Sequence, residues 1–316
     1  MTSMLWVLGA GGLLGSAVVR EAARRPELTT LVVPTPWDDA EASGTTFLDA
    51  VHQLNREAAP GSDLQVAWCA GAGVVASSQA QFDLEARVVD RLILALGQLR
   101  PDLLSRLRVF VSSSAGGVYA GAGHAPHDEF GPTAPLVPYG HAKLALEQQF
   151  RGLAEATGAR VVLGRIANLY GPGQNLGKGQ GLISTLLWGA LEGAPVKVYV
   201  DLDTVRDYLY VDDAAHMVLA CLDRAAETEV GAVTTKILAT GTRVTVFNLL
   251  HVVRRLSSQR PLVVQGASPL RAGQARDLSL RSRVWPEIDR LASTPLLVGV
   301  HRTLLDLQRT RLEARA

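Results

Sequence analysis

Two residues four positions apart, Tyr139 and Lys143, are the pair in this chain best suited to acid–base chemistry. Residues i and i+4 share one face of a helix, so the phenol and the ammonium can address one pocket. Tyrosine has an ordinary pKa of about 10, and a nearby ammonium favours the phenolate. An apolar stretch ends in three serines, Ser112 to Ser114, and one of them can supply a further hydroxyl. These residues predict a proton-transfer site.

The glycines at 9, 12 and 15 follow a short apolar run at the start of the chain. Their spacing fits a dinucleotide-binding turn, in which Gly9 permits the turn, Gly12 lets the backbone approach a pyrophosphate, and Gly15 lets the following helix pack on the sheet. The phosphates would lie at the positive helix end, beside Leu13 and Leu14. We therefore expect a dinucleotide at this end of the chain.

Composition limits the class of protein. The chain has 316 residues, 47% of them hydrophobic, and a net charge of +1 without a basic stripe, so nucleic acid is not an expected partner. Two cysteines build neither a disulfide framework nor a zinc cluster, and His124, His127 and His141 lack the carboxylate spacing of a metal site. We expect no metal, no secretory signal, no membrane span and a cytoplasmic location.

Apolar runs that predict strands alternate with helical patterns through the first half of the chain, which favours a parallel sheet covered on both faces. The expected strands are Leu5–Leu8, Leu31–Val33, Val66–Cys69, Arg108–Ser112 and Arg160–Leu163. The expected helices are Leu13–Arg24, Phe47–Glu57, Phe82–Leu99, Tyr139–Thr157 and a terminal one over Arg302–Arg311. The interval between the second strand and Val66 is compact, so the third strand usual in such sheets is expected to be short or missing.

In order and approximate spacing, the glycine turn, the serine strand, Val118-Tyr119 and the Tyr139/Lys143 pair resemble the extended short-chain dehydrogenase/reductase superfamily, specifically its NAD(P)-dependent epimerases and dehydratases of nucleotide sugars. The resemblance implies an α/β fold with a Rossmann-type doubly wound parallel sheet and a smaller C-terminal α/β substrate lobe. We expect residues 1–170 to bind the dinucleotide and 171–316 to form mainly the substrate lobe, with segments around 205–225 and 233–256 packing back on the sheet.

The resemblance also implies which residues contact the cofactor. Besides the glycine turn, they are Cys69, Ala70 and Gly71 in a small-residue turn that continues through Ala72 and Gly73, then Ser112, Tyr139 and Lys143. NAD is normally selected by a carboxylate at the end of the second strand. That position reads Val33-Pro34-Thr35-Pro36-Trp37, with Asp38 and Asp39 only later, so the choice between NAD and NADP stays open.

For the substrate, the resemblance implies Ser114 as the catalytic serine, with Ser113 a close second, and it implies phosphate contacts for three residues. They are Asn168 in Arg-x-x-Asn-x-Tyr-Gly-Pro, Arg206 in Arg-Asp-Tyr-x-x-Val-x-Asp, and, more loosely, Arg271. Related 4,6-dehydratases carry Thr-Asp-Glu where this chain has Ser114-Ala115-Gly116, so dehydration is disfavoured.

The expected function is transient oxidation at one carbon of a nucleoside-diphosphate sugar, as in an epimerase, with Tyr139 as acid and base. The nearer alternative is an NAD(P)H-dependent reductase of a 4-keto deoxysugar or another carbonyl compound. A non-catalytic dinucleotide-sensing regulator is the alternative of another class, against which the intact Tyr139/Lys143 pair counts. A homodimer through the helices at 82–99 and 139–157 is expected from the resemblance.

Overall fold

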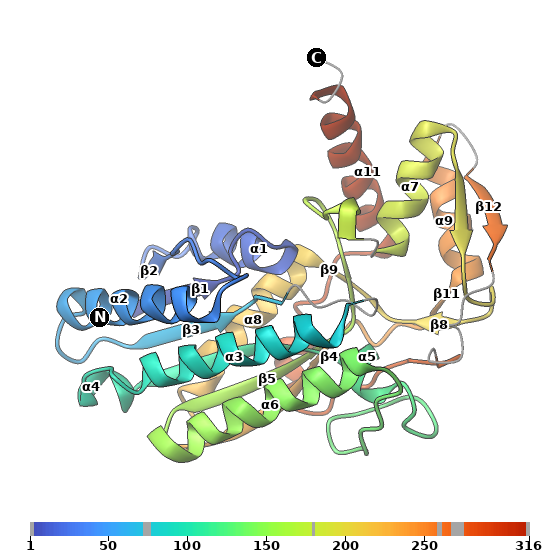
Figure 1. Ribbon diagram of the computed structural model, residues 1–316. Helices are drawn as coiled ribbons and strands as arrows, with labels where there is room; N and C mark the ends of the chain where they lie inside the picture. The colour runs from blue at the N-terminus through green and yellow to red at the C-terminus, as the bar shows by residue number, and fades with distance from the viewer. Residues whose placement is uncertain (1–2, 72–76, 179–180, 258–260, 267–274, 314–316) are drawn as a thin grey trace.

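The computed structural model describes residues 3–71, 77–178, 181–257, 261–266 and 275–313. At its centre is a six-stranded sheet in the order β10-β5-β4-β3-β1-β2, in which every neighbouring pair is parallel (Figure 1). The strands are β1 (Ser3–Leu8), β2 (Leu28–Leu31), β3 (Leu64–Trp68), β4 (Leu107–Ser114), β5 (Arg160–Ile166) and β10 (Val233–Leu238).

Helices cover both faces of this sheet. One face carries α1 (Leu13–Ala22) and α8 (Val211–Ala225), and the opposite face carries α2 (Ala40–Glu57), α3 (Gln79–Leu96) and α6 (Pro138–Thr157). The strands are apolar almost throughout, because both of their faces are buried under helices. The doubly wound α/β sheet expected from the sequence is confirmed.

The two faces of β4 carry alternating side chains. Val109 and Val111 belong to the core under α2, α3 and α6, whereas Phe110 belongs to the core under α1 and α8. Because side chains alternate along a strand, Ser113 continues the first face, and Ser112 and Ser114 continue the second.

The sheet ends at β2, and the third strand is missing, as the compact interval in the sequence predicts. Between Leu31 and Leu64 the structure contains one helix, α2, and no strand. The helix begins at Ala40, seven residues before the expected Phe47, because the Asp39 carboxylate caps it by accepting hydrogen bonds from the backbone N–H groups of Glu41 and Ala42.

A second lobe has its own apolar core, to which α7 (Leu182–Glu192), α9 (Val246–Leu256) and α11 (Leu296–Glu313) contribute. Three short strand pairs surround that core and the boundary between the lobes. The pairs are β6 (Asn168–Tyr170) with β9 (Tyr208–Tyr210), β7 (Pro195–Val198) with β12 (Leu262–Gln265), and β8 (Val205–Arg206) with β11 (Val244–Thr245). The remaining short helices are α4 (Pro101–Leu104), α5 (Ala115–Tyr119), the 3-10 turn η1 (Leu176–Lys178) and α10 (Pro286–Asp289).

The C-terminal part of the chain returns to the edge of the sheet. Lys236 in β10 is fully buried, forms an ion pair with Asp289 and donates a hydrogen bond to Ser282. Glu129 accepts hydrogen bonds from the Ser282 hydroxyl and from the backbone N–H of Arg283. These contacts fasten the segment around 282–289 to β10.

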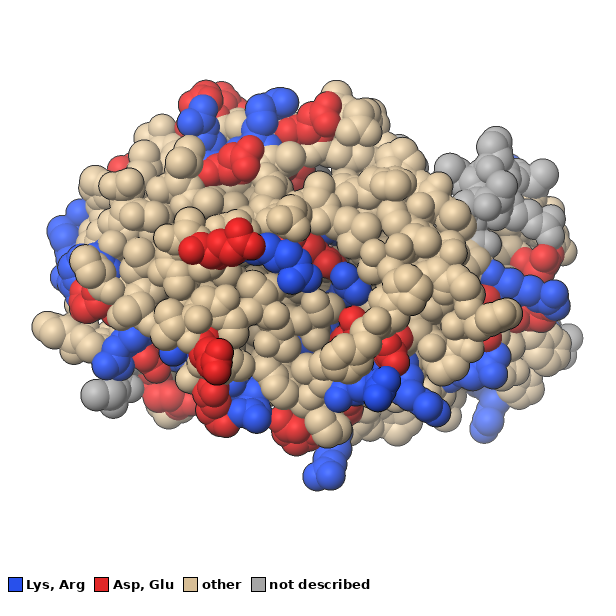
Figure 2. Space-filling view, turned by 90° about the horizontal axis from the view of Figure 1, so that it is seen from below, with Lys and Arg blue, Asp and Glu red and all other residues tan. Residues whose placement is uncertain are grey.

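Across the face seen in Figure 2, Lys and Arg side chains are interspersed with Asp and Glu side chains, and broad uncharged areas separate them. Within the described ranges, no helix has the length and apolar character needed to cross a membrane. The same residues contain no group of three or more His, Cys, Asp and Glu side chains arranged to hold a metal ion.

Candidate active site

The glycine turn between β1 and α1 is closely packed on one side and open on the other. Gly9 has a φ of +81°, and a methyl group there would lie 2.6 Å from the backbone nitrogen of Ala70. A methyl group on Gly15 would lie 2.1 Å from the Gly9 carbonyl oxygen, whereas one on Gly11 would meet nothing within 4 Å. Glycine is therefore required at 9 and 15 for packing, and the turn is open at Gly11.

The N-terminus of α1 suits an anion. Gly12 is its N-cap and brings no side-chain hydrogen bond, and the first turn, with Leu13 and Leu14, contains no acidic residue. The first N–H groups of a helix need acceptors, and a phosphate supplies them. The turn fits the pyrophosphate of a dinucleotide.

The turn after β3 lies directly beside the glycine turn, since Ala70 is the residue that Gly9 approaches. Burial raises the pKa of the Cys69 thiol to about 12, so this side chain is neutral. Gly71 has a φ of +151°, and the position of its absent methyl group is 3.2 Å from Lys143 Nζ. Ala72 and Gly73 lie outside the described residues.

Tyr139 and Lys143 stand in the first turns of α6, which begins at Pro138. The helix approaches α5 closely, because a methyl group on Gly140 would lie 2.2 Å from the carbonyl oxygen of Gly117. The position of a methyl group on Gly117 is 3.0 Å from Tyr139 Cε1, so the phenol ring rests on that glycine. Lys143 is 6% exposed, and its Nζ lies 5.7 Å from the centre of the Tyr139 ring.

A carboxylate that sequence analysis missed, Glu85 on α3, lies beside this pair. Its Oε1 accepts a hydrogen bond from Lys143 Nζ at 3.2 Å. Burial lowers the pKa of the Lys143 ammonium, but Glu85 and Tyr139 outweigh that effect and the net shift is upward. Helical spacing could have indicated this residue, because Glu85 lies on the same face of α3 as the buried residues Phe82 and Val89.

The three serines of β4 face different surroundings. Ser113 is buried, and its hydroxyl donates a hydrogen bond of 2.7 Å to Glu147 Oε1. Ser114 is half-buried, and its Oγ accepts a hydrogen bond from the backbone N–H of Gly117, the glycine on which Tyr139 rests. Ser112 is also half-buried and faces the same way as Ser114.

A buried network fixes the inner side of α6. Glu147 forms a two-point ion pair with Arg165 of β5, at 2.9 Å and 2.7 Å. Arg165 also donates a hydrogen bond to the Tyr119 hydroxyl. Burial lowers the pKa of the Arg165 guanidinium, but Glu147 outweighs it and the net shift is upward. The ion pair anchors α6, and with it Tyr139 and Lys143, to the sheet.

Two candidate substrate residues, Asn168 and Arg206, lie at the junction of the lobes. The Asn168 side-chain amide donates to the backbone carbonyl of Asp207, the residue next to Arg206. The Arg206 guanidinium donates to the backbone carbonyls of Val205 and Ala275 and, within the described residues, has no carboxylate at ion-pair distance. Burial lowers its pKa. Arg206 is half-buried, and within the described residues Asp277 acts on it only from beyond ion-pair distance, so the guanidinium suits an anionic ligand. The third candidate, Arg271, lies outside the described residues.

The two aspartates of the same motif make contacts within the protein. Asp207 accepts hydrogen bonds from the backbone N–H and the hydroxyl of Thr240. Asp213, near the start of α8, accepts two from Thr294, each of 2.7 Å. Both aspartates thus tie distant segments of the chain together.

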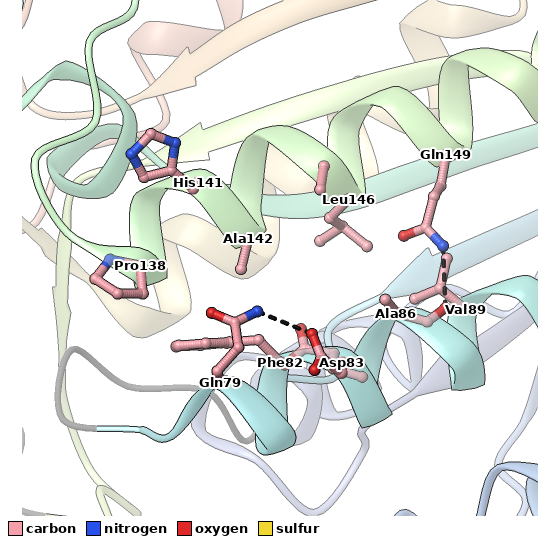
Figure 3. A pocket seen from close by; sticks show the side chains of 12 residues that line it. Gln79, Phe82, Asp83, Ala86, Val89, Pro138, His141, Ala142, Leu146 and Gln149 are labelled. Atoms are coloured by element: carbon pink, nitrogen blue, oxygen red, sulfur yellow. Dashed lines mark hydrogen bonds between the residues drawn. The ribbon is translucent and has the colours of Figure 1, made fainter.

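A groove of about 370 Å³ runs between α3 and α6 (Figure 3). Phe82, Ala86, Ala142 and Leu146 line it from the two helices. Tyr139 and Lys143 do not line this groove, although Glu85 does. The groove thus adjoins the pair through Glu85, which bonds Lys143, and through Phe82, which contacts the Tyr139 ring.

A doubly wound sheet with a glycine turn at one end and a tyrosine–lysine pair beside it defines a dinucleotide-binding fold. Residues 5–234 match the model of the NAD dependent epimerase/dehydratase family, and the chain belongs to this family. The resemblance inferred from the sequence and the expected class of nicotinamide cofactor are thereby confirmed.

Individual relatives are similar over part of the chain. The chain is 28% identical over 116 residues to a dTDP-4-dehydro-6-deoxyglucose reductase of Escherichia coli, over 37% of this chain and 36% of the relative. It is 30% identical over 116 residues to a putative UDP-glucose 4-epimerase of Methanocaldococcus jannaschii, over 37% of this chain and 38% of the relative. The matches thus span little more than a third of either curated relative.

Among solved structures, MoeE5 in complex with UDP-glucose and NAD superposes with a TM-score of 0.78 at 23% identity, covering 98% of this chain and 100% of the other. The similarity extends over both lobes and shows that the fold is shared.

Proposed function

We propose that this chain is an NAD(P)-dependent epimerase-type enzyme that transiently oxidises one carbon of a nucleotide-activated sugar. The observation that carries the proposal is the place of Lys143, whose Nζ lies 3.2 Å from the methyl position of Gly71 and 5.7 Å from the Tyr139 ring. The acid–base pair thus adjoins the turn after β3, and that turn packs against the glycine turn at Gly9. NAD is the cofactor to test first, because the family and the MoeE5 complex are both described with it.

In this proposal Gly9, Gly12 and Gly15 shape the turn that holds the pyrophosphate, with the N–H groups of Leu13 and Leu14. Cys69, Ala70, Gly71 and Ser112 line the rest of the cofactor site. The bound nicotinamide supplies hydride transfer to and from the sugar carbon. Tyr139 takes the proton of the sugar hydroxyl and returns it, and Lys143 stabilises the phenolate.

Ser114 hydrogen-bonds the reacting sugar oxygen, because the Ser113 hydroxyl is already engaged by buried Glu147. Arg206 binds the diphosphate, since its half-buried guanidinium donates to backbone carbonyls and has no carboxylate at ion-pair distance within the described residues, and Asn168 contributes a neighbouring contact. Arg271 remains a candidate for a second phosphate contact. Ala115 and Gly116 offer no carboxylate to expel water, which argues against dehydration.

A reductase of a 4-keto deoxysugar is the second candidate, favoured by the similarity to the Escherichia coli enzyme. The same residues serve both reactions, because each moves one proton and one hydride at one carbon. The two differ in cofactor turnover, since an epimerase regenerates its cofactor and a reductase consumes it. The regulator alternative would require a chain that binds the dinucleotide and converts no sugar.

We also propose that, as the sequence suggests, residues 1–170 bind the dinucleotide and residues 171–316 mainly bind the sugar. A homodimer would form through α3 and α6, and the apolar groove between these helices supports that arrangement. Cys69 and Cys221 are both free thiols, which suits a reducing compartment such as the cytoplasm.

The deciding experiment is incubation of the purified chain with a panel of uridine- and thymidine-diphosphate sugars and their 4-keto forms. Absorbance of the reduced nicotinamide and proton spectra of the products are followed together. New sugar isomers with constant absorbance identify an epimerase, and stoichiometric loss of absorbance identifies a reductase. If no sugar changes although NAD binds, the enzymatic proposal is wrong.

Tyr139→Phe tests the assigned acid–base group. We expect turnover to fall by at least about 10²-fold, because the proton acceptor is gone, while the dissociation constant for NAD changes little. Fluorescence titration of the cofactor provides the control. Full activity of this variant would refute the role of Tyr139.

A further inference from the structure

The lysine of the proposed acid–base pair is not isolated. Lys143 is 6% exposed, so its ammonium has left water and needs a counter-charge. Among the described residues that counter-charge is Glu85, which comes from a different helix and lies 3.2 Å away. The two helices α3 and α6 are therefore joined at the level of the site by a buried charge.

The glycine turn after β3 closes over this ion pair. The methyl position of Gly71 is 3.2 Å from Lys143 Nζ and 3.3 Å from Glu85 Oε1, so the backbone passes over both groups at once. The Glu85 side chain is 19% exposed, through the groove between α3 and α6. Glu85 thus contacts both the turn after β3, at Gly71, and Lys143.

We propose that Glu85 is a positioning residue: its carboxylate holds the Lys143 ammonium beside Tyr139 and offsets part of the positive charge that acts on the phenol. The proposal rests on the proposed function of Tyr139 and Lys143, and it assigns Glu85 an action through Lys143.

The electrostatic surroundings of Lys143 are simple. Among the described residues, the groups that face it are Glu85 on α3 and Tyr139 on its own helix, and both raise its pKa against the lowering by burial. Cys69 on the neighbouring turn stays an uncharged thiol, since burial raises its pKa to about 12. Glu85 is therefore the main group that offsets the lowering of the Lys143 pKa by burial, and removal of its charge should lower that pKa.

The first test uses the free protein and needs no substrate. Lysine occurs only at 143, 178, 197 and 236, so ¹³C,¹⁵N-lysine labelling gives few signals, and Lys143→Arg assigns the one of interest. In Glu85→Gln the titration midpoint of the Lys143 ammonium should fall by about one pH unit or more. Asp83→Asn removes an equal charge from an exposed site on the same helix and should leave the midpoint unchanged.

The second test is the pH profile of kcat/KM on the sugar that the panel identifies. With the carboxylate replaced by an amide, the uncompensated ammonium favours the phenolate more strongly, so the acidic limb should move to lower pH by about one unit. Glu85→Ala should move it in the same direction, since the charge and not the acceptor atom is responsible. Asp83→Asn should keep the wild-type profile.

An unchanged Lys143 titration in Glu85→Gln would overturn the proposal, as would an equal shift in Asp83→Asn. A lower Lys143 midpoint with an unmoved pH profile would overturn it too, because Glu85 would then be a structural partner only. If the chain converts no sugar, the proposed function fails, while the lysine titration in the free protein still decides whether Glu85 holds the ammonium.

Discussion

At the scale of single residues, the alternation of side chains along β4 separates two neighbouring serines that the sequence leaves nearly equivalent. Ser113 faces inward and is hydrogen-bonded to Glu147, which is itself paired with Arg165. Ser114 faces the other way and caps α5 beside Tyr139. Their substitutions should therefore have different kinds of effect.

Ser114→Ala should lower kcat/KM by about 10²-fold, as loss of a positioned hydrogen-bond donor does, and lower the free energy of unfolding by about 0.5–2 kcal/mol, because the cap of α5 is lost. Ser113→Ala should keep most activity and lower the free energy of unfolding by about 1–3 kcal/mol, because a buried hydrogen bond to a carboxylate is lost. Steady-state kinetics and urea unfolding of both variants measure the difference. Loss of activity confined to Ser113→Ala would reverse the assignment.

Local spacing in the sequence was enough to place Tyr139 and Lys143 on one helix and to place the glycines in a turn between a strand and a helix. It could not reveal Glu85 as the partner of Lys143, since that ion pair joins residues 58 positions apart. It also could not choose between Ser113 and Ser114, because the choice depends on which face of the strand α6 covers.

At the scale of elements, the approach of α1 to β1 depends on glycines whose missing side chains have different neighbours. A methyl group on Gly15 would lie 2.1 Å from the Gly9 carbonyl oxygen, and one on Gly11 would meet nothing within 4 Å. The two positions therefore form a matched pair in one turn.

Gly15→Ala should push α1 from its place, lower the free energy of unfolding by about 1–3 kcal/mol and weaken NAD binding. Gly11→Ala should change stability by less than about 0.5 kcal/mol. Thermal or urea unfolding and a cofactor titration measure both quantities. If the two variants proved equally stable, the packing account of the turn would be wrong.

The boundaries of elements were predicted best where the burial pattern is simple. The helix of Tyr139 begins at Pro138, one residue from the expected start, and both end at Thr157. The second strand was misplaced, as it occupies Leu28–Leu31 and not Leu31–Val33. The strand contains two threonines at the edge of the sheet, and the more apolar run that follows them was wrongly predicted as the strand.

At the scale of the whole molecule, the sequence predicted the doubly wound sheet and a short or missing third strand, but not the construction of the second lobe. The strand pairs β7 with β12 and β8 with β11 join segments that are far apart in the chain. Such pairings depend on tertiary packing, and the hydrophobic periodicity of a local stretch of sequence does not predict them.

A charge placed on the α3–α6 surface tests the proposed homodimer. Ala145 is exposed on α6 and lines the groove, so Ala145→Arg should convert dimer to monomer by burying an unpaired charge. Thr45→Arg, on the exposed face of α2, is the matched control and should stay dimeric. Sedimentation equilibrium measures the mass, and a wild-type chain that is monomeric at micromolar concentration would contradict the proposal.

Lys236 belongs to the edge strand of the sheet, whereas Asp289, its counter-ion, comes from the far end of the chain. A chimera that joined residues 1–240 of this chain to the tail of a relative would keep the cation and discard the anion. Breaking a buried pair in this way costs about 3–5 kcal/mol, a large fraction of the stability of a typical domain. Under the proposed function, sugar specificity is therefore not transferred with the C-terminal segment alone, and the strand and the returning segment must be exchanged together.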